Sequence, residues 1–452
     1  MGSTYRELFS APGSRAFSLA GLLARLPLPM TGIGIITLLS QLHDSYTLAG
    51  LVAATFVLTY ALLSPQISRL VDLKGQSRVL PVATVISIAG LLILAAGSWW
   101  NVGYWSLFLG ALLAGFMPSM SAMVRARWTA LYRGQPRLQT AYSLETVFDE
   151  ATFILGPPLA VGLAVMVLPQ AALLVAAALL LLGVSALLAQ RGSEPAVEVR
   201  DAGAARPGSV IRLAGVRWLT LLLVAMGVIV GSVDIVSVAF AEQLNRPAAA
   251  SLVLSAYAVG SCVSGLVFGA MQPGMPLHRQ LLVGAAATAL TTLPLMAAGS
   301  IPALAAAVLL AGLCFAPTMI VAMTLVERLV PERQVTEGMT WLLAGLNIGV
   351  ALGAAGAGRM VDGAGGGVVS FWRWWRVSWC CWWRCGLVDT CAPGRLARQV
   401  FFRDSKDPNH EYLLICSRAR NPFMAGGDRR RPRHLCRGYH RDAAGRLADP
   451  DF

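Results

Sequence analysis

Pro118-Ser119-Met120 stands near the end of one long apolar stretch, and Pro317-Thr318-Met319 stands near the end of another, 199 residues later. Two further pairs have offsets of 197 and 202 residues: Leu155-Gly156 with Leu352-Gly353, and Ser40-Gln41 with Glu242-Gln243. Three offsets that agree within five residues indicate a duplicated unit. Because the unit holds six apolar stretches, the repeat predicts two pseudo-symmetric bundles of six helices each.

The composition indicates where such bundles lie. The chain has 452 residues, of which 56% are hydrophobic and 13% are charged. Crossing the hydrocarbon core of a membrane takes about 20 apolar residues. The fold class expected is therefore an all-α integral membrane protein, because soluble proteins do not join so many apolar stretches with so little charge. Eleven stretches qualify: 16–41, 46–67, 79–98, 104–124, 142–167, 170–190, 218–241, 249–271, 281–298, 301–326 and 338–358.

Arginine and lysine gather in alternate loops. The loop 68–78 holds Arg69, Lys74 and Arg78, and the segment 125–137 holds four arginines, whereas the opposite loops offer little more than Arg246 and Arg359. Positive charge is retained on the cytoplasmic side of membrane proteins. The expected location is a cell inner (plasma) membrane, crossed many times, with a cytoplasmic N-terminus.

One polar connection divides the chain near its middle. Residues 191–217 contain Glu194-Pro195 and Arg206-Pro207-Gly208, which are typical of a flexible linker. The predicted organisation is an N-terminal six-helix bundle, a cytoplasmic linker, a C-terminal bundle with five recognisable helices and an atypical tail. Their bounds are 1–190, 191–217, 218–365 and 366–452.

The tail departs from the repeat. A twelfth helix is expected near 368–389, but that segment carries three arginines among its tryptophans and cysteines. Six of the 12 Trp, six of the 8 Cys and sixteen of the 36 Lys and Arg residues follow residue 360. Charges of this kind are expensive in lipid. The twelfth helix is therefore predicted to be missing or scrambled.

Three explanations of the tail remain open. One is a Cys-rich metal or redox segment, although the spacings form no clean zinc pattern. Another is a basic nucleic-acid-binding segment around Arg429–Arg433. The favoured hypothesis is a shift of the reading frame near Gly365–Val369, because Val-Ala codons in GC-rich DNA give Trp and Arg when read one base out of step. An active product is not assured on that hypothesis.

Ionisable residues inside apolar stretches are the candidates for function, since each must be paired, hydrated or used. Arg25 lies in Ala24-Arg25-Leu26-Pro27-Leu28-Pro29, where prolines leave backbone carbonyls without helical partners. It is expected to meet an anionic substrate group or a carboxylate on another helix; the alternative is that it reaches the membrane interface.

Asp234 is the leading candidate for proton coupling or cation recognition. It lies deep in the stretch 218–241, in Gly231-Ser232-Val233-Asp234, with no Lys or Arg close in sequence. A carboxylate shielded from water can take up and release a proton. The rival interpretation places it near the outer surface, where it would be solvated.

The stretch 142–167 opens with Glu145, Asp149 and Glu150. Glu145 and Asp149 share a helix face, whereas Glu150 points about 100° away. Glu145 is expected at the interface, and Asp149 and Glu150 deeper, with a proton shared among them or a partner in Arg125 or Arg127. In the second half Asn347 occupies the position that corresponds to Glu150, where a helix–helix hydrogen bond is the preferred role.

The loop Ser68-Arg69-Leu70-Val71-Asp72-Leu73-Lys74-Gly75-Gln76-Ser77-Arg78 resembles the signature loop of the major facilitator superfamily, Gly-x-x-x-Asp-Arg-x-Gly-Arg-Arg. Asp72 and Gly75 match, and Lys74 and Arg78 keep basic charge nearby. The resemblance implies that Asp72 binds a helix N-terminus or an Arg in a latch between the two halves, and that Gly75 makes a tight turn. Gly156-Pro157-Pro158 is similar to the Gly-Pro motif of the antiporter branch.

The resemblance implies a secondary transporter that moves a small organic molecule by alternating access. Proton-coupled efflux is the function favoured; uptake of a small metabolite and a non-transporting sensor or scaffold are the alternatives. It also implies a central cavity to which both halves contribute. The residues expected there are Arg25, Asp234, Tyr257 and Asn347, with Asp149 or Glu150 towards the cytoplasmic mouth. Met120 and Met319, at symmetric positions after a proline, are further candidates for the lining, although plain packing is the preferred role for both.

An enzyme is not expected. The chain lacks a phosphate-binding Gly-Lys-Ser/Thr loop and a His-Glu-x-x-His motif, and none of its five His lies within an apolar stretch. No cofactor and no metal site are therefore predicted. The expected partners are a small-molecule substrate, protons as coupling ion and the lipid bilayer, without nucleic acid, and the protein is expected to be a monomer.

Overall fold

A computed structural model describes residues 2–43, 46–196, 208–244, 246, 249–271 and 274–363. The chain divides into two compact units, Met1–Gln399 and Val400–Phe452, and all described residues belong to the first. The twelfth helix expected near 368–389 and the tail 366–452 lie outside the described residues.

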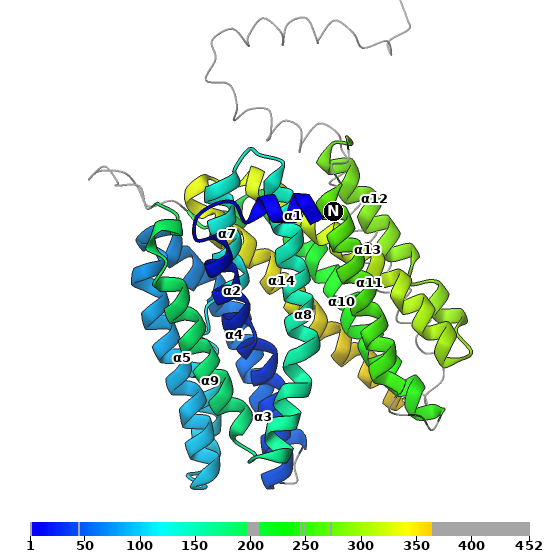
Figure 1. The fold of residues 1–452 in the computed structure, drawn as a ribbon. Helices are drawn as coiled ribbons and strands as arrows, with labels where there is room; N and C mark the ends of the chain where they lie inside the picture. Colours follow the sequence, from blue (N-terminus) through cyan, green and yellow to red (C-terminus); the bar gives the residue numbers. More distant parts are fainter. Residues whose placement is uncertain are drawn as a thin grey trace, which may run out of the picture. The chain divides into compact units, whose positions relative to one another are not determined.

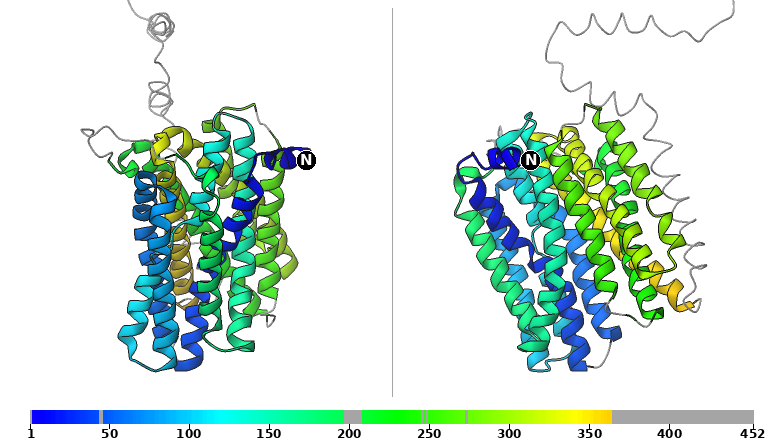
Figure 2. Two further views of the ribbon diagram at one scale, coloured as in Figure 1. Left: turned by 60° about the vertical axis from the view of Figure 1, so that its left-hand side comes forward. Right: turned by 45° about the vertical axis from the view of Figure 1, so that its right-hand side comes forward.

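The first half of the described unit consists of helices connected by short turns (Figure 1). They are α1 (Gly2–Leu8), α2 (Ser14–Arg25), α3 (Pro27–His43), α4 (Tyr46–Lys74), α5 (Gln76–Trp99), α6 (Tyr104–Ala114), α7 (Met120–Tyr132), α8 (Arg137–Met166) and α9 (Ala171–Leu188). Figure 2 shows the short α1 lying across the end of the bundle, at an angle to the long helices.

The second half repeats the pattern after two 3₁₀ turns, η1 (Arg191–Ser193) and η2 (Val210–Arg212). Its elements are α10 (Ala214–Gln243), α11 (Ala249–Ala270), α12 (Leu277–Leu290), η3 (Pro294–Ala297), α13 (Ile301–Leu329), η4 (Glu332–Gln334) and α14 (Val335–Gly363). In the described residues the architecture is all-helical, and nine helical stretches are long and apolar enough to cross a membrane. The expectation of an all-α membrane protein is confirmed.

Three expected spans differ from the observed helices. The stretch 16–41 is divided at Leu26 into α2 and α3. The stretch 104–124 is not continuous, because Gly115–Ser119 separates α6 from α7, and Pro118 has no amide hydrogen to continue a helix ladder. The stretch 281–298 ends early, because α12 stops at Leu290 and a turn with η3 follows. Pro294 again stands where the regular helix has ended.

Leucine and valine side chains cover the outside of the bundle. Leu62 is 65% exposed and Val85 is 64% exposed, which is a cost in water but suits contact with lipid chains. Inside, α10 and α14 approach so closely that a Cβ atom on Gly227 would meet the Leu346 carbonyl oxygen at 2.2 Å. Small residues permit such backbone contacts between membrane helices.

One end of the unit carries most of the basic side chains. We call it the basic face: the turns at Lys74–Arg78, Tyr132–Arg137 and Leu329–Val335, together with η1 and η2. The N-terminal helix α1 lies at this end (Figure 1). The cavity described next lies deeper in the unit, between the two halves.

Candidate functional site

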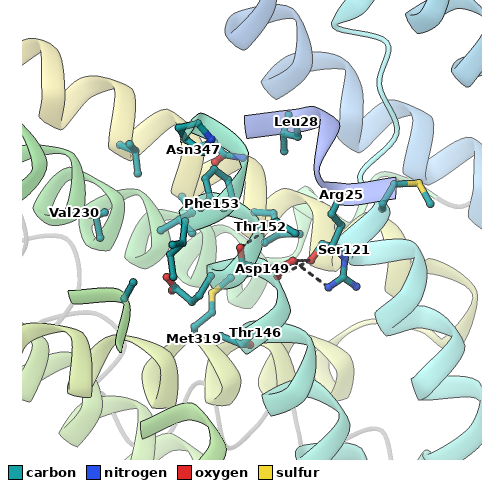
Figure 3. Close-up of a pocket in the computed structure, with 18 of the residues that line it drawn as sticks. Arg25, Leu28, Ser121, Thr146, Asp149, Thr152, Phe153, Val230, Met319 and Asn347 are labelled. Atoms are coloured by element: carbon teal, nitrogen blue, oxygen red, sulfur yellow. Dashed lines mark hydrogen bonds and ion pairs between the residues drawn. The ribbon is translucent and has the colours of Figure 1, made fainter. Parts of the chain in front are cut away.

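A cavity of about 610 Å³ lies between the halves and is lined by both. Its volume falls in the range of about 300–1,000 Å³ that is usual for small-molecule sites. Most of its wall is apolar, and the ionisable side chains of the wall are few (Figure 3). They are Arg25, Tyr60, Asp149, Glu150, Asp234 and Tyr257.

Arg25 and Glu145 form a buried ion pair in the first half. Arg25 also lies 3.3 Å from Asp149, measured between Nη1 and Oδ1. Glu145 accepts further hydrogen bonds from Ser18 at 3.2 Å and from the Trp128 indole at 2.7 Å. Glu145 is fully buried within the protein, so its side chain is exposed neither to water nor to lipid. The face of α8 that carries Glu145 packs against α2, not against a membrane surface.

Arg125 completes the cluster from α7. Its guanidinium is buried and lies 2.8 Å from Asp149, and it also donates to Ser121. Asp149 is 21% exposed, toward the cavity. Figure 3 shows Arg25, Ser121 and Asp149 converging from α2, α7 and α8. We call Arg25, Arg125, Glu145 and Asp149 the buried charge cluster: two cations and two anions, which is the compensation that buried charge requires.

The sequence periodicity explains this convergence. Glu145 and Asp149 are four residues apart on α8 and therefore lie on one face. Ser121 and Arg125 are likewise four apart on α7. Arg127, two positions further, points elsewhere: it donates to Gln76 at 2.8 Å and to Ser193 at 2.7 Å, beneath η1. Of the two arginines considered as partners for Asp149, the structure therefore brings Arg125 to it.

Glu150 and Asp234 have different surroundings. Glu150 accepts a hydrogen bond from Ser261 of α11 at 3.0 Å. Asp234 lines the cavity from α10, and no residue that the structure describes bonds to its carboxylate. Neither side chain pairs with an Arg or Lys of the described segments. They are therefore the two carboxylates of the wall that lack a counterion.

The remaining predicted cavity residues also reach the wall. Met120 and Met319, the equivalent positions of the repeat, both line the cavity, as do Tyr257 and Asn347. The ring centroids of Tyr257 and Phe315 lie 5.9 Å apart. The hydrogen bond expected for Asn347 between helices is absent from the described part of the chain. Asn347 lines the cavity, and the glycines on either side of it bring α14 close to α10.

The two halves bind each other at the basic face. The Asp72 carboxylate accepts hydrogen bonds from the backbone amides of Thr336 and Glu337 at the start of α14, at 3.3 and 2.8 Å. Gly75, directly before α5, has a φ of 90°, a conformation that favours glycine. Arg78 is exposed. A carboxylate at a helix N-terminus satisfies free amides and the helix dipole.

Further contacts close the same face. Ser68 and Thr340 share a hydrogen bond of 2.7 Å, and Arg133 lies 3.1 Å from Glu327 and 3.2 Å from Glu332. At the same end, α8 and α11 are held together by Thr140, which donates to the Gly269 carbonyl at 2.8 Å. The contacts between the halves described here lie at the level of the cavity or on its basic side.

Residues 17–245 and 218–379 match the model of the Major Facilitator Superfamily. The chain belongs to this superfamily. An uncharacterized MFS-type transporter, y4rN of Sinorhizobium fredii, is 25% identical over 372 residues, which are 79% of this chain and 91% of that protein. The protein is thus similar to transporters over most of its length.

Solved structures of superfamily members share the fold. A bacterial homologue of the iron transporter ferroportin, in the outward-facing state, matches with a TM-score of 0.65 and 15% identity, over 91% of this chain and 100% of that one. The human organic anion transporter MFSD10 (TETRAN) matches with a TM-score of 0.62 and 16% identity, over 82% and 99%. At these identities the likeness shows the fold alone.

Several wall residues of this superfamily member were missed from the sequence. Tyr60, Ser121, Phe153 and Phe315 all line the cavity. Tyr60 is a polar aromatic side chain within an apolar helix, which is a usable signal. Phe153 and Phe315 are not distinguishable from lipid-facing or core aromatics by sequence. In the described segments, His, Cys, Asp and Glu side chains form no group of three that could hold a metal ion.

Proposed function

We propose that the protein is a proton-coupled exporter of a small organic molecule. The observation that carries the proposal is the pair of carboxylates, Glu150 and Asp234, which line the cavity without a counterion. A group in this situation can alternate between a protonated and a charged state as substrate leaves and enters. The buried charge cluster is not suited to this role, because its anions are already compensated.

Alternating access explains why both halves contribute to one cavity. The contacts of Asp72 and Arg133 hold the basic face shut, and they are polar contacts that water can replace. Opening this face while the opposite side closes would make the cavity accessible from the other side of the membrane. Since one chain supplies the whole wall, the proposed working unit is a monomer.

The proposed orientation places the basic face in the cytoplasm of a cell with an inner membrane, and the N-terminus with it. The supporting observation is the concentration of arginine in the turns of that face. In this orientation the contacts of Asp72 and Arg133 close the cytoplasmic side. Asp72 then acts as the latch that keeps the cytoplasmic side closed.

The coupling is tested with purified protein in liposomes that contain a pH-sensitive dye. A collection of small cations, neutral compounds and anions is loaded inside, and the outside is made acidic. For an exporter that exchanges protons, at least one compound leaves faster as protons enter. A symporter instead accumulates a compound from outside together with protons, whichever way the protein is inserted.

Asp234→Asn provides the decisive comparison. It is expected to abolish proton-driven flux of any compound found, while exchange of labelled for unlabelled compound continues without a pH gradient. Glu7→Gln serves as the matched control, because Glu7 is exposed on α1, far from the cavity wall. Unchanged proton-driven flux in Asp234→Asn would remove this carboxylate from the mechanism, and the absence of any flux would favour a sensor or scaffold.

A further inference from the structure

The charge on the cavity wall is unequal between its two sides. On the side of α2 and α7, two guanidinium groups are balanced by Glu145 and Asp149. On the side of α10 and α11, two carboxylates remain: Asp234 of α10, and Glu150 of α8, which accepts from Ser261 of α11. Each is close enough to the other to interact electrostatically. When both are charged, the cavity carries two negative charges more than it carries positive ones.

Aromatic rings stand beside these carboxylates. Tyr257 lies within electrostatic range of both Glu150 and Asp234. Its ring and that of Phe315 form a pair with centroids 5.9 Å apart and planes inclined at 55°. Aromatic faces attract cations, most strongly where water is excluded. This second feature is independent of the acidic side chains and favours the same kind of ligand.

The rest of the wall suits an apolar body. Phe153, Leu254, Met319 and Leu343 contribute to the lining, and the cavity volume of about 610 Å³ accommodates several rings. Methionine adapts to ligands of differing shape. An anion would face two carboxylates without a free guanidinium, because Arg25 and Arg125 are already bonded to Glu145 and Asp149.

We infer that the substrate is a lipophilic organic cation. Its charge lies between Glu150 and Asp234, its rings pack against Tyr257 and Phe315, and its apolar groups contact Met319. This inference rests on the proposed function, since it names the substrate class for the same cavity. Proton coupling does not determine the sign of the charge on the substrate, and this inference specifies it.

Two ions of nearly equal size and opposite charge, tetraphenylphosphonium and tetraphenylborate, test the inference. Equilibrium binding of each ion is measured on the purified full chain in detergent, with empty micelles as background. Saturable binding of the phosphonium and none of the borate is expected. Equal binding of both ions, stronger binding of the borate, or no saturable phosphonium binding would overturn the inference.

Substitutions of Glu150 and Asp234 test whether these two carboxylates bind the phosphonium ion. Glu150→Gln and Asp234→Asn are each expected to weaken phosphonium binding by about tenfold or more, because each removes one nearby opposite charge. The double variant is expected to lose saturable binding, whereas Glu7→Gln keeps the wild-type affinity. Gel filtration and thermal unfolding verify that each variant is folded. Wild-type affinity in the folded double variant would show that the cation binds elsewhere and overturn the assignment.

The result is separable from the test of coupling. If phosphonium binds through both carboxylates but moves no protons in liposomes, the substrate class stands and proton coupling fails. If protons drive only neutral or anionic compounds and phosphonium does not bind, coupling stands and the substrate class fails.

Discussion

At one wall of the cavity Asp149, and Glu145 buried behind it, pair with two guanidinium groups, whereas at the other wall Glu150 and Asp234 pair with none. All four are carboxylates within long apolar helices, so their sequence surroundings are alike. Their environments differ: the paired carboxylates stabilise the fold, whereas the unpaired ones are free to bind a proton or a ligand. Removing one partner of a compensated buried charge lowers the free energy of unfolding strongly. An uncompensated charge has no such partner, so its replacement is expected to cost little stability.

The largest effect is expected from Arg25→Met. The substitution leaves the fully buried Glu145 with hydrogen bonds from Ser18 and Trp128 and without a cation. Breaking a buried ion pair from one side costs about 3–5 kcal/mol in the free energy of unfolding. Titration with SDS in mixed micelles, followed by tryptophan fluorescence, measures this loss.

Arg25→Met combined with Glu145→Leu is the control for that loss. Because replacing both members of a buried pair with apolar residues is often close to neutral, most of the lost stability is expected to return. A double variant as unstable as the single one would mean that Arg25 stabilises the protein by packing and not by charge.

Asp72→Asn tests a third kind of carboxylate, one that is held by backbone amides at a helix N-terminus. The variant keeps the shape of the side chain but removes its charge, so the bonds from Thr336 and Glu337 weaken by about 1–2 kcal/mol. The ratio of closed to open states of the basic face then falls by a factor of about 5–30.

Labelling of a cysteine in the cavity measures that change. In a variant whose other cysteines are replaced by serine, Asn347→Cys is treated with an impermeant maleimide from the side of the basic face. Its labelling rate is expected to rise when Asp72→Asn is added. Arg78→Gln is the comparison, because Arg78 is exposed; an equal rise in both variants would argue against a specific latch.

Much of the fold was predictable, because helix length and apolar content follow from the sequence. The positions of Arg25 and Asp234 inside apolar stretches were also predictable, and so was the possibility that Arg25 meets a carboxylate on another helix. The identity of that carboxylate was not. Whether Glu145 faces α2 or the membrane interface depends on the rotation of α8 about its axis, which packing decides.

Other details depend on contacts that are distant in sequence. The break at Gly115–Ser119 follows from Pro118 and from the approach of α4, where a Cβ on Gly115 would meet Thr59 at 2.5 Å. Asn347 was expected to bond to another helix, but it lines the cavity, where none of the described residues bonds to its amide. Predicting which residues line the cavity requires knowing which helices are neighbours, and sequence periodicity does not give this information.

Tyr5→Phe provides a scale for an uncharged contact between the halves. The Tyr5 hydroxyl donates to the Leu266 carbonyl of α11 at 2.8 Å, so its removal is expected to cost about 0.5–1.5 kcal/mol in unfolding free energy. Burial raises the pKa of the Tyr5 phenol. The contribution is therefore fully present below about pH 10, the pKa of an unfolded tyrosine, and declines as the pH rises above it.

Measurement of Tyr5→Phe at pH 7 and at pH 8 checks both statements. The loss of stability is expected to be the same at the two values, since the phenol keeps its proton at each. A loss that changes between them would show that another titrating group is coupled to this contact.

The smallest change in stability is expected from Asp234→Asn. The carboxylate has no bonding partner in the described part of the chain, so the amide breaks no contact and carries no charge into the cavity. The free energy of unfolding is expected to stay within about 0.5 kcal/mol of the wild type, or to increase slightly. The same SDS titration measures it, with Arg25→Met as the opposite extreme.

A loss comparable to that of Arg25→Met would mean that Asp234 is compensated after all, and the distinction between the two walls would fail. A small change in stability together with lost proton-driven flux would instead assign Asp234 to transport, because a residue that merely supports the fold cannot be removed without affecting the fold.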